Sequence, residues 1–263
     1  MRYAEYPPSP ALATIVHCFW FLEGAGDGCP EPVIPDGRAE IIFHLGARFE
    51  RHTIGAHPTI QPRAMIVGQL TAPMTIAHRG YARVAAVRLQ PAALRSVIGA
   101  DATDVADDAF DLDAVLGRTG ELQERLAAAP SDRMRAAILD EWLRTIVRRE
   151  PRADVTAAAS MILSRRGAVD VRSLSRQTAL GPRQLERAFK REAGLAPKTL
   201  ARLTRLQHAL GRISAGAPLA SVAFDCGYYD QPHMTRDFAL LAETSPSAWR
   251  RHAGVLTPLF VST

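Results

Sequence analysis

Arginine and glutamine side chains recur in two stretches of the C-terminal half, residues 180–200 and 229–249. Arginine can form paired hydrogen bonds with guanine, and glutamine with adenine, in the major groove of DNA. The two stretches match at a fixed offset of 49 residues. The matched pairs are Leu185 and Met234, Arg187 and Arg236, Phe189 and Phe238, Pro197 and Pro246, and Leu200 and Trp249. The chain therefore contains two copies of one unit, each able to present polar groups to a nucleic acid.

Each copy has residues that can start a helix and bury one of its faces. Gly181 and Pro182 are expected to begin the helix of the first copy, and Asp230 is the expected N-cap in the second. Leu185 and Phe189, four residues apart, should lie together against a preceding helix. The outer surface is left to polar residues, which are Arg183, Gln184, Arg187, Lys190 and Arg191 in the first copy and Gln231, His233, Thr235 and Arg236 in the second.

The polar residues differ in the roles that the sequence favours. Arg183, Gln184 and Gln231 lie early on their helices, where base contacts concentrate, so DNA contact is favoured over a solvated surface. Arg187 and Arg236 fit two roles equally well, because they could contact DNA or hold the motif together through ion pairs. The candidate acids for such pairs are Glu186, Asp225 and Asp237.

The elements that position these residues are helices. After Pro151 the pattern predicts seven helices in about 100 residues, joined by connections of a few residues. A helix, a tight turn and a second helix of similar length form a helix-turn-helix unit. We expect two such units, with their second helices at about 182–193 and 230–241, joined by a long helix around Leu200 to Ile213.

The first hundred residues predict short strands separated by turns. The strand candidates are "TIVHCFWFLEG", "EIIFHLG", "MIVGQL", "MTIAH" and "RVAAVRLQP". Many short strands at close spacing favour a barrel or sandwich, and from Pro91 onward helical spacing follows. The predicted fold class is α+β, with a β-rich, barrel-like (cupin-like) domain and following helices over 1–150 and an all-α domain over 151–263.

Charge divides the chain in the same way. Residues 1–150 carry 16 Arg and no Lys against 19 acidic residues, a net charge of −3, whereas residues 151–263 carry 16 basic against 8 acidic residues, a net charge of +8. This asymmetry indicates that the second part alone meets a polyanion.

The C-terminal stretches carry a resemblance to a known family. "GYYDQPHMTRDF", from Gly227 to Phe238, is close to a signature of the AraC-type DNA-binding domain, and "SPSAWR" matches that domain's closing motif. The last hundred residues therefore resemble that domain, which has two helix-turn-helix units joined by a long helix. The chain departs from the family pattern at four positions: Ala179 and Gly181 replace a usual Gly and Ser, and Ala239 and Glu243 replace a usual basic residue and Gly.

The resemblance implies a sequence-specific transcription regulator whose partner is double-stranded DNA. The expected DNA contacts are Arg172, Pro182, Arg183, Gln184, Arg187, Lys190, Arg191, Asp230, Gln231, His233, Thr235 and Arg236. "WFLEG", "IPDGRAEIIFHLG", "VGQL" and "VRLQPAALRSVIGA" resemble an uncharacterised sensor-like domain found ahead of some such regulators. The layout suggests three further partners: a small-molecule effector, a second copy of the chain through its N-terminal region, and RNA polymerase.

Other chemistry is less favoured by the sequence. His17, His44, His52, His57 and His78 invite a metal-dependent barrel enzyme fused to a DNA-binding module, but their spacing forms no compact ligand set. His233 likewise has no second ligand three or four residues away, so a packing or surface role is favoured over a metal site. No hydrolase triad, phosphate loop or dinucleotide fingerprint is evident, and we expect neither an enzyme nor a cofactor.

A turn, an acidic run and the cysteines each have a simple structural interpretation. Asp36 and Arg38 flank Gly37 in a turn, for which a local Asp hydrogen bond is favoured over an effector-binding or interface role. The acidic run "DATDVADDAFDLD" predicts a solvated loop, and the three cysteines predict buried or bystander thiols. The sequence has no run of 18 apolar residues and no signal-peptide pattern, so a cytoplasmic protein without membrane contact is expected.

Overall fold

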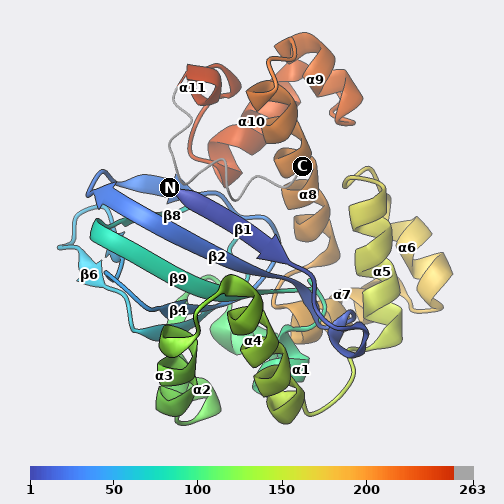
Figure 1. The fold of residues 1–263 in the computed structure, drawn as a ribbon. Helices are drawn as coiled ribbons and strands as arrows, with labels where there is room; N and C mark the ends of the chain where they lie inside the picture. The colour runs from blue at the N-terminus through green and yellow to red at the C-terminus, as the bar shows by residue number, and fades with distance from the viewer. Residues whose placement is uncertain (252–263) are drawn as a thin grey trace.

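Two antiparallel sheets dominate the N-terminal half of the computed structural model, which describes residues 1–251 (Figure 1). The larger sheet has the strand order β1-β2-β9-β4-β7-β10 and the smaller has the order β3-β8-β5-β6. The larger comprises β1 (Arg2–Tyr6), β2 (Val16–Asp27), β4 (Glu40–His44), β7 (Ala64–Val67), β9 (Arg79–Leu89) and β10 (Ala109–Asp111). The smaller comprises β3 (Glu31–Val33), β5 (Glu50–His52), β6 (Thr59–Ile60) and β8 (Met74–Ala77).

Both faces of the larger sheet are covered. Along β2, Trp20 and Leu22 belong to a core shared with Phe49 of the smaller sheet, whereas Phe19 and Phe21 belong to a second core shared with helices. Because successive side chains of a strand point to opposite faces, a strand buried on both faces is apolar at nearly every position. This explains why residues 18–22 of β2 and 84–87 of β9 are continuous apolar runs rather than alternating ones.

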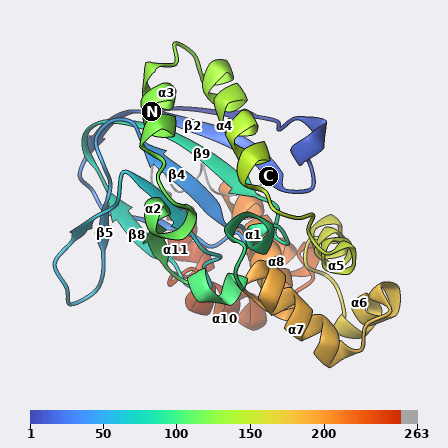
Figure 2. The same cartoon turned by 90° about the horizontal axis from the view of Figure 1, so that it is seen from below.

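Four helices pack on the face of the larger sheet that is turned away from the smaller one (Figures 1 and 2). They are α1 (Leu94–Ile98), α2 (Leu112–Leu116), α3 (Gly120–Ala128) and α4 (Asp132–Ile146). Ser131 caps α4 by accepting a hydrogen bond from the backbone N–H of Met134 at 3.3 Å. A short 3-10 helix precedes β2 (η1, Pro10–Leu12), and another follows α1 (η2, Ala102–Val105).

From Ala153 to Arg251 the described chain is helical. Its seven helices are α5 (Ala153–Ser164), α6 (Val171–Thr178), α7 (Pro182–Ala193), α8 (Pro197–Ser214), α9 (Leu219–Asp225), α10 (Gln231–Leu241) and α11 (Pro246–Arg251). Helices α6 and α7 form the first helix-turn-helix unit and α9 and α10 the second, and α8 connects them (Figure 1). Six residues of the matched pairs are buried in one core, namely Leu185, Phe189, Leu200, Met234, Phe238 and Trp249, and the two prolines, Pro197 and Pro246, are also buried.

The predicted α+β fold class is confirmed, with a β-rich N-terminal region and a C-terminal region of two helix-turn-helix units. The two sheets lie against each other without closing into a barrel. The predicted domain boundary between residues 150 and 151 remains a prediction. The last residues of the predicted second domain, 252–263, lie outside the described part of the chain. Within the described residues, no helix is long and apolar enough to cross a membrane.

The interpretation of the acidic run at 101–113 as a solvated loop was wrong. It contains η2, β10 and the start of α2, and the side chains of Ala102, Val105 and Leu112 are buried. Apolar residues alternate with the acids there, so the run can bury one side and expose the other. The strands β1, β3, β5, β6 and β10 were also missed, because they are short or rich in polar residues.

Candidate functional site

Helix α7 presents most of the predicted DNA contacts of the first unit. Leu185 and Phe189 are fully buried against the core, so the opposite side of α7 is exposed. Gln184 has a second task, since its Oε1 accepts a hydrogen bond from the N–H of Gly181 at 3.1 Å and so caps its own helix. The predicted contacts that are exposed on α7 are Pro182, Arg183, Gln184, Arg187, Lys190 and Arg191, and Arg172 is exposed on α6.

Helix α10 repeats this arrangement in the second unit. Asp230 is the N-cap, as predicted, and its Oδ1 accepts a hydrogen bond from the N–H of His233 at 2.6 Å. The His233 ring accepts a 3.4 Å hydrogen bond from the N–H of Tyr229 and packs edge-on against Tyr228, with ring centroids 5.3 Å apart. His233 thus has contacts within the motif, whereas Gln231, Thr235 and Arg236 are exposed.

The acids that were candidates to hold Arg187 and Arg236 are engaged elsewhere. Their partners are different basic residues: Glu186 with Lys190 at 2.9 Å, Asp225 with Arg212 at 2.7 Å, and Asp237 with Arg202 at 2.7 Å. Among residues 1–251, neither Arg187 nor Arg236 forms an ion pair. The two matched arginines are therefore exposed and available to an external anion.

The first unit also contacts the N-terminal region. Glu192 of α7 is 1% exposed and forms ion pairs with Arg95 of α1 at 3.1 Å and with Arg149. Arg191, a predicted DNA contact, lies 3.3 Å from Asp101, which precedes η2. Figure 2 shows α1 beside α7. Helix α10, in contrast, packs mainly on α8, α9 and α11. Of the two candidate reading helices, α7 is therefore held partly by the N-terminal region, whereas α10 packs mainly within the C-terminal region.

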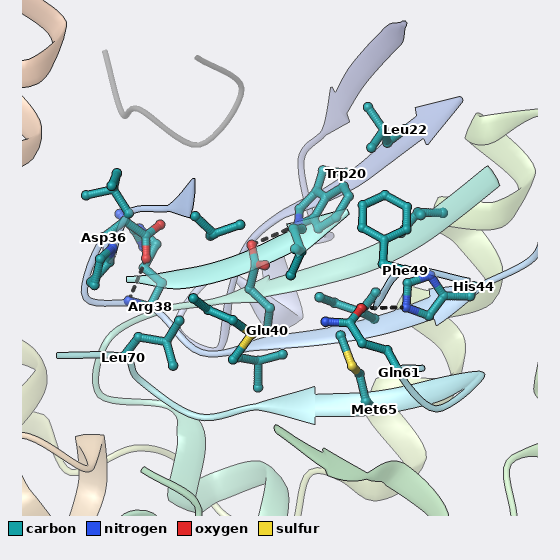
Figure 3. Close-up of a pocket in the computed structure, with 18 residues that line it drawn as sticks. Trp20, Leu22, Asp36, Arg38, Glu40, His44, Phe49, Gln61, Met65 and Leu70 are labelled. Atoms are coloured by element: carbon teal, nitrogen blue, oxygen red, sulfur yellow. Dashed lines mark hydrogen bonds between the residues drawn. The ribbon is translucent and has the colours of Figure 1, made fainter. Parts of the chain in front are cut away.

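A pocket lies between the two sheets of the N-terminal region (Figure 3). The cavity measures about 70 Å³, room for a few water molecules, and about 740 Å³ with its open mouth included. Its walls are apolar and include Trp20, Phe49, Met65, Leu70 and Met74. Five polar residues also line it, namely Asp36, Arg38, Glu40, His44 and Gln61.

The polar side chains of the pocket form two groups. Glu40 accepts hydrogen bonds from Trp20 at 2.9 Å and from Arg88 at 2.8 Å, and burial raises the pKa of its carboxyl group. His44 Nε2 donates to Gln61 Oε1 at 3.1 Å, a tautomer assigned from the acceptor it faces. Burial lowers the pKa of His44 to about 4, so its ring is neutral at pH 7.

The turn at residues 34–38 joins this pocket to α8. The predicted local hydrogen bond is present, because Asp36 Oδ1 accepts from the N–H of Arg38 at 2.9 Å. The turn has a second role that the sequence did not favour. Gln207 of α8 donates to the carbonyl groups of Ile34 and Pro35 at 3.3 and 2.9 Å, and Gly37 lies directly against Leu200.

Metal-ligand geometry is not found in the part of the chain that the structure describes. No group of three or more His, Cys, Asp or Glu side chains there could hold a metal ion. His44 and His78 instead flank the ring of Phe49, with centroid distances of 5.3 and 4.5 Å. Cys18 and Cys226 are buried free thiols and Cys29 is an exposed one.

Two family profiles match separate parts of the chain. A helix-turn-helix domain matches residues 174–252, which span both units, and a domain of unknown function, DUF6597, matches residues 4–111. No curated protein matches the chain. The first match bears directly on the exposed side chains of α7 and α10, and the second covers the two sheets and the pocket.

Two solved structures of ToxT share the fold at low identity. ToxT from Vibrio cholerae is 8% identical with a TM-score of 0.50, covering 88% of this chain and 98% of ToxT. ToxT bound to (E)-4-(8-methylnaphthalen-1-yl)but-3-enoic acid is also 8% identical, with a TM-score of 0.51 and the same coverage. The C-terminal domain of AraT, a response regulator from Geobacillus stearothermophilus, is 23% identical with a TM-score of 0.36, covering 38% of this chain and 85% of that domain.

Proposed function

Because the chain is a DNA-binding transcription regulator with an AraC-type helix-turn-helix domain, we propose that α7 and α10 enter two successive major grooves of one duplex. The observation that carries this proposal is the duplicated unit, which leaves Arg187 and Arg236 exposed and without ion pairs at matched positions within the described residues. Two reading helices on one side of a duplex would lie about one helical turn, ~34 Å, apart.

Base contacts and phosphate contacts would be divided among the exposed residues. Arg183, Gln184 and Gln231 lie in the first turns of their helices, where base edges are within reach, and are proposed to read sequence. The other basic residues among the predicted contacts would hold phosphates, which gives an affinity that falls as salt rises; they are Arg172, Arg187, Lys190, Arg191 and Arg236. Domains at 1–150 and 151–263 would then separate sensing from reading.

We further propose that the pocket between the sheets binds an effector and that the turn at residues 34–38 transmits its presence to α8. The same turn lines the pocket through Asp36 and Arg38 and contacts α8 through Gly37 and the carbonyl groups bonded by Gln207. Helix α8 connects the two units, so a shift of α8 changes their relative placement. That ToxT has been solved with a small organic acid supports a ligand site in this fold. Contacts with a second copy of the chain and with RNA polymerase remain proposals.

The test of DNA reading is selection from randomised duplex DNA by the full-length protein at near-physiological salt. Two enriched blocks about one helical turn apart are expected if both units read bases. A single block would mean that one unit holds phosphates only, and no enrichment together with binding that collapses as salt rises would refute sequence-specific reading. An Arg187→Ala, Arg236→Ala double variant should bind all sequences more weakly, because it removes two of the proposed phosphate contacts.

A further inference from the structure

The cavity between the sheets has hydrogen-bond acceptors without partners. Both hydrogen bonds to Glu40 use Oε1, and none reaches Oε2 within residues 1–251. His44 Nδ1, in the tautomer that donates to Gln61, is a buried acceptor that also has no partner in that part of the chain. Figure 3 shows Glu40 near the middle of the cavity and His44 beside Gln61 at one end. Buried acceptors are costly unless a donor reaches them.

Two carboxylates and one guanidinium line the polar end of the cavity, which belong to Asp36, Glu40 and Arg38. Arg88 lies 2.8 Å from Glu40, 3.7 Å from Asp36 and 3.4 Å from Glu5, so three carboxylates surround one guanidinium. Arg38 adds a second cation there, and its Nη1 donates to Gln90 at 3.3 Å. Glu5 is partly exposed and does not line the cavity, whereas the carboxylates of Asp36 and Glu40 do, together with the guanidinium of Arg38.

The two lining carboxylates argue against an anionic ligand. A carboxylate entering the cavity would be a third acid beside Asp36 and Glu40, and its desolvation would be poorly compensated. An ammonium group would supply hydrogen-bond donors to the acceptors that have no partner. The apolar part of a ligand would meet aromatic and sulfur-containing walls.

We propose that this cavity binds a small lipophilic amine, with its ammonium group on Glu40 and Asp36 and its apolar body between Phe49, Met65 and Met74. One part of this inference rests on the proposed regulator function, namely that amine binding alters DNA binding through α8. The ligand site itself stands on the cavity, its unpaired acceptors and its charge.

The experiment compares three probes that share one apolar body: 2-phenylethylamine, 2-phenylethanol and phenylacetate. Each is titrated calorimetrically into the full-length protein at pH 7.5. The amine is expected to bind at least tenfold more tightly than the alcohol, and phenylacetate is expected to bind most weakly. Equal or tighter binding of phenylacetate would overturn the proposal, as would the absence of binding by all three probes.

Variants of residues that line the cavity test where the amine binds. Glu40→Gln and Asp36→Asn keep side-chain size while removing charge, and each should weaken amine binding at least tenfold with little effect on the alcohol. Asn at position 36 retains the oxygen that accepts from Arg38, so this variant remains informative if Glu40→Gln fails to fold. Leu70→Trp should block all probes by filling the cavity. The control is Glu121→Gln, an exposed site on α3, and an amine preference that survives both charge-removing variants would refute the assignment.

A parallel measurement separates this inference from the proposed function. DNA affinity is measured in the same protein with and without saturating 2-phenylethylamine. Amine binding with no DNA binding in either condition would leave the site standing and remove the regulator function. DNA binding without amine binding would leave the regulator function standing and remove the amine site. An amine that binds yet leaves DNA affinity unchanged would overturn the link through α8.

Discussion

Arg183 is the side chain best placed to read a base. It lies in the first turn of α7, is exposed, and follows Pro182, which fixes the start of the helix. Arg183→Ala should therefore weaken binding to the selected sequence by about 1–3 kcal/mol and relax the preference at one base pair. Binding isotherms on the selected site and on single-base variants measure both effects. Equal losses on every sequence would make Arg183 a phosphate contact instead.

His44 predicts a dependence of stability on pH. Its pKa is lowered to about 4 in the folded protein by burial, so between pH 6.5 and pH 4 the unfolded chain binds a proton that the folded chain does not. Stability from this group is present above that window and is lost as pH falls, by up to about 1.4 kcal/mol per pH unit. Urea unfolding at several pH values should show this slope, and His44→Gln should reduce it.

His57→Gln provides the control for that measurement. His57 is exposed on the loop between β5 and β6, and the variant should keep the wild-type slope. If His44→Gln and His57→Gln gave the same slope, the acid sensitivity would come from other groups.

At the residue scale, the sequence predicted the helix caps and the buried partners but not the pocket. Matched spacing identified Leu185, Phe189 and Asp230, because local helix geometry decides their positions. Asp36 and Glu40 lie on the turn before β4 and at its start, and they meet Trp20 and Arg88 only through strand pairing. Pairing over such separations leaves no local pattern, so the sequence supported only the turn hydrogen bond of Asp36.

Among the elements, the two units differ where their reading helices end. Gly194 follows α7 with φ +85°, and the matched residue after α10 is Glu243 with φ 48°. Left-handed backbone costs a non-glycine residue about 1–2 kcal/mol. A Cβ on Gly194 would also lie 3.0 Å from the carbonyl oxygen of Ala102, whereas the Glu243 side chain is exposed. In the first unit glycine avoids both backbone strain and a close contact, and in the second unit Glu243 bears the backbone strain.

Glu243→Gly should therefore raise the free energy of unfolding by about 1 kcal/mol, because it removes the strain while leaving the described packing unchanged. Chemical denaturation of the full-length protein measures this. The matched variant Gly194→Ala should be destabilising by at least a similar amount, because it adds both strain and a close contact. A stabilising Gly194→Ala would show that the end of α7 adapts freely.

The elements themselves were largely predictable where periodicity was strong. The seven C-terminal helices follow from apolar spacing and short connections, and the long strands β2 and β9 follow from continuous apolar runs. Segments of two to five residues at sheet edges have too few positions to show a period. The acidic run was misread because its composition hid the apolar residues that dock it near α7.

For the whole molecule, Glu192 joins the two regions. Its buried carboxylate is held by Arg95 and Arg149, and removing it would leave two cations at the interface without their partner. Glu192→Ala should lower the free energy of unfolding by about 3 kcal/mol. Glu186→Ala, which removes an exposed pair with Lys190, should change it by less than about 1 kcal/mol. Similar values for both variants would show that the buried pair contributes little.

Gly37 has a mechanical consequence for the connecting helix. A Cβ at this position would lie only 2.4 Å from Leu200 Cδ1, so bare backbone rests on α8 with no side chain between them. Packed interiors are stiff and transmit strain. We therefore expect a displacement on the cavity side of this turn to reach α8 directly. Because Glu192 ties α7 to the N-terminal region, we expect the second unit to move farther than the first.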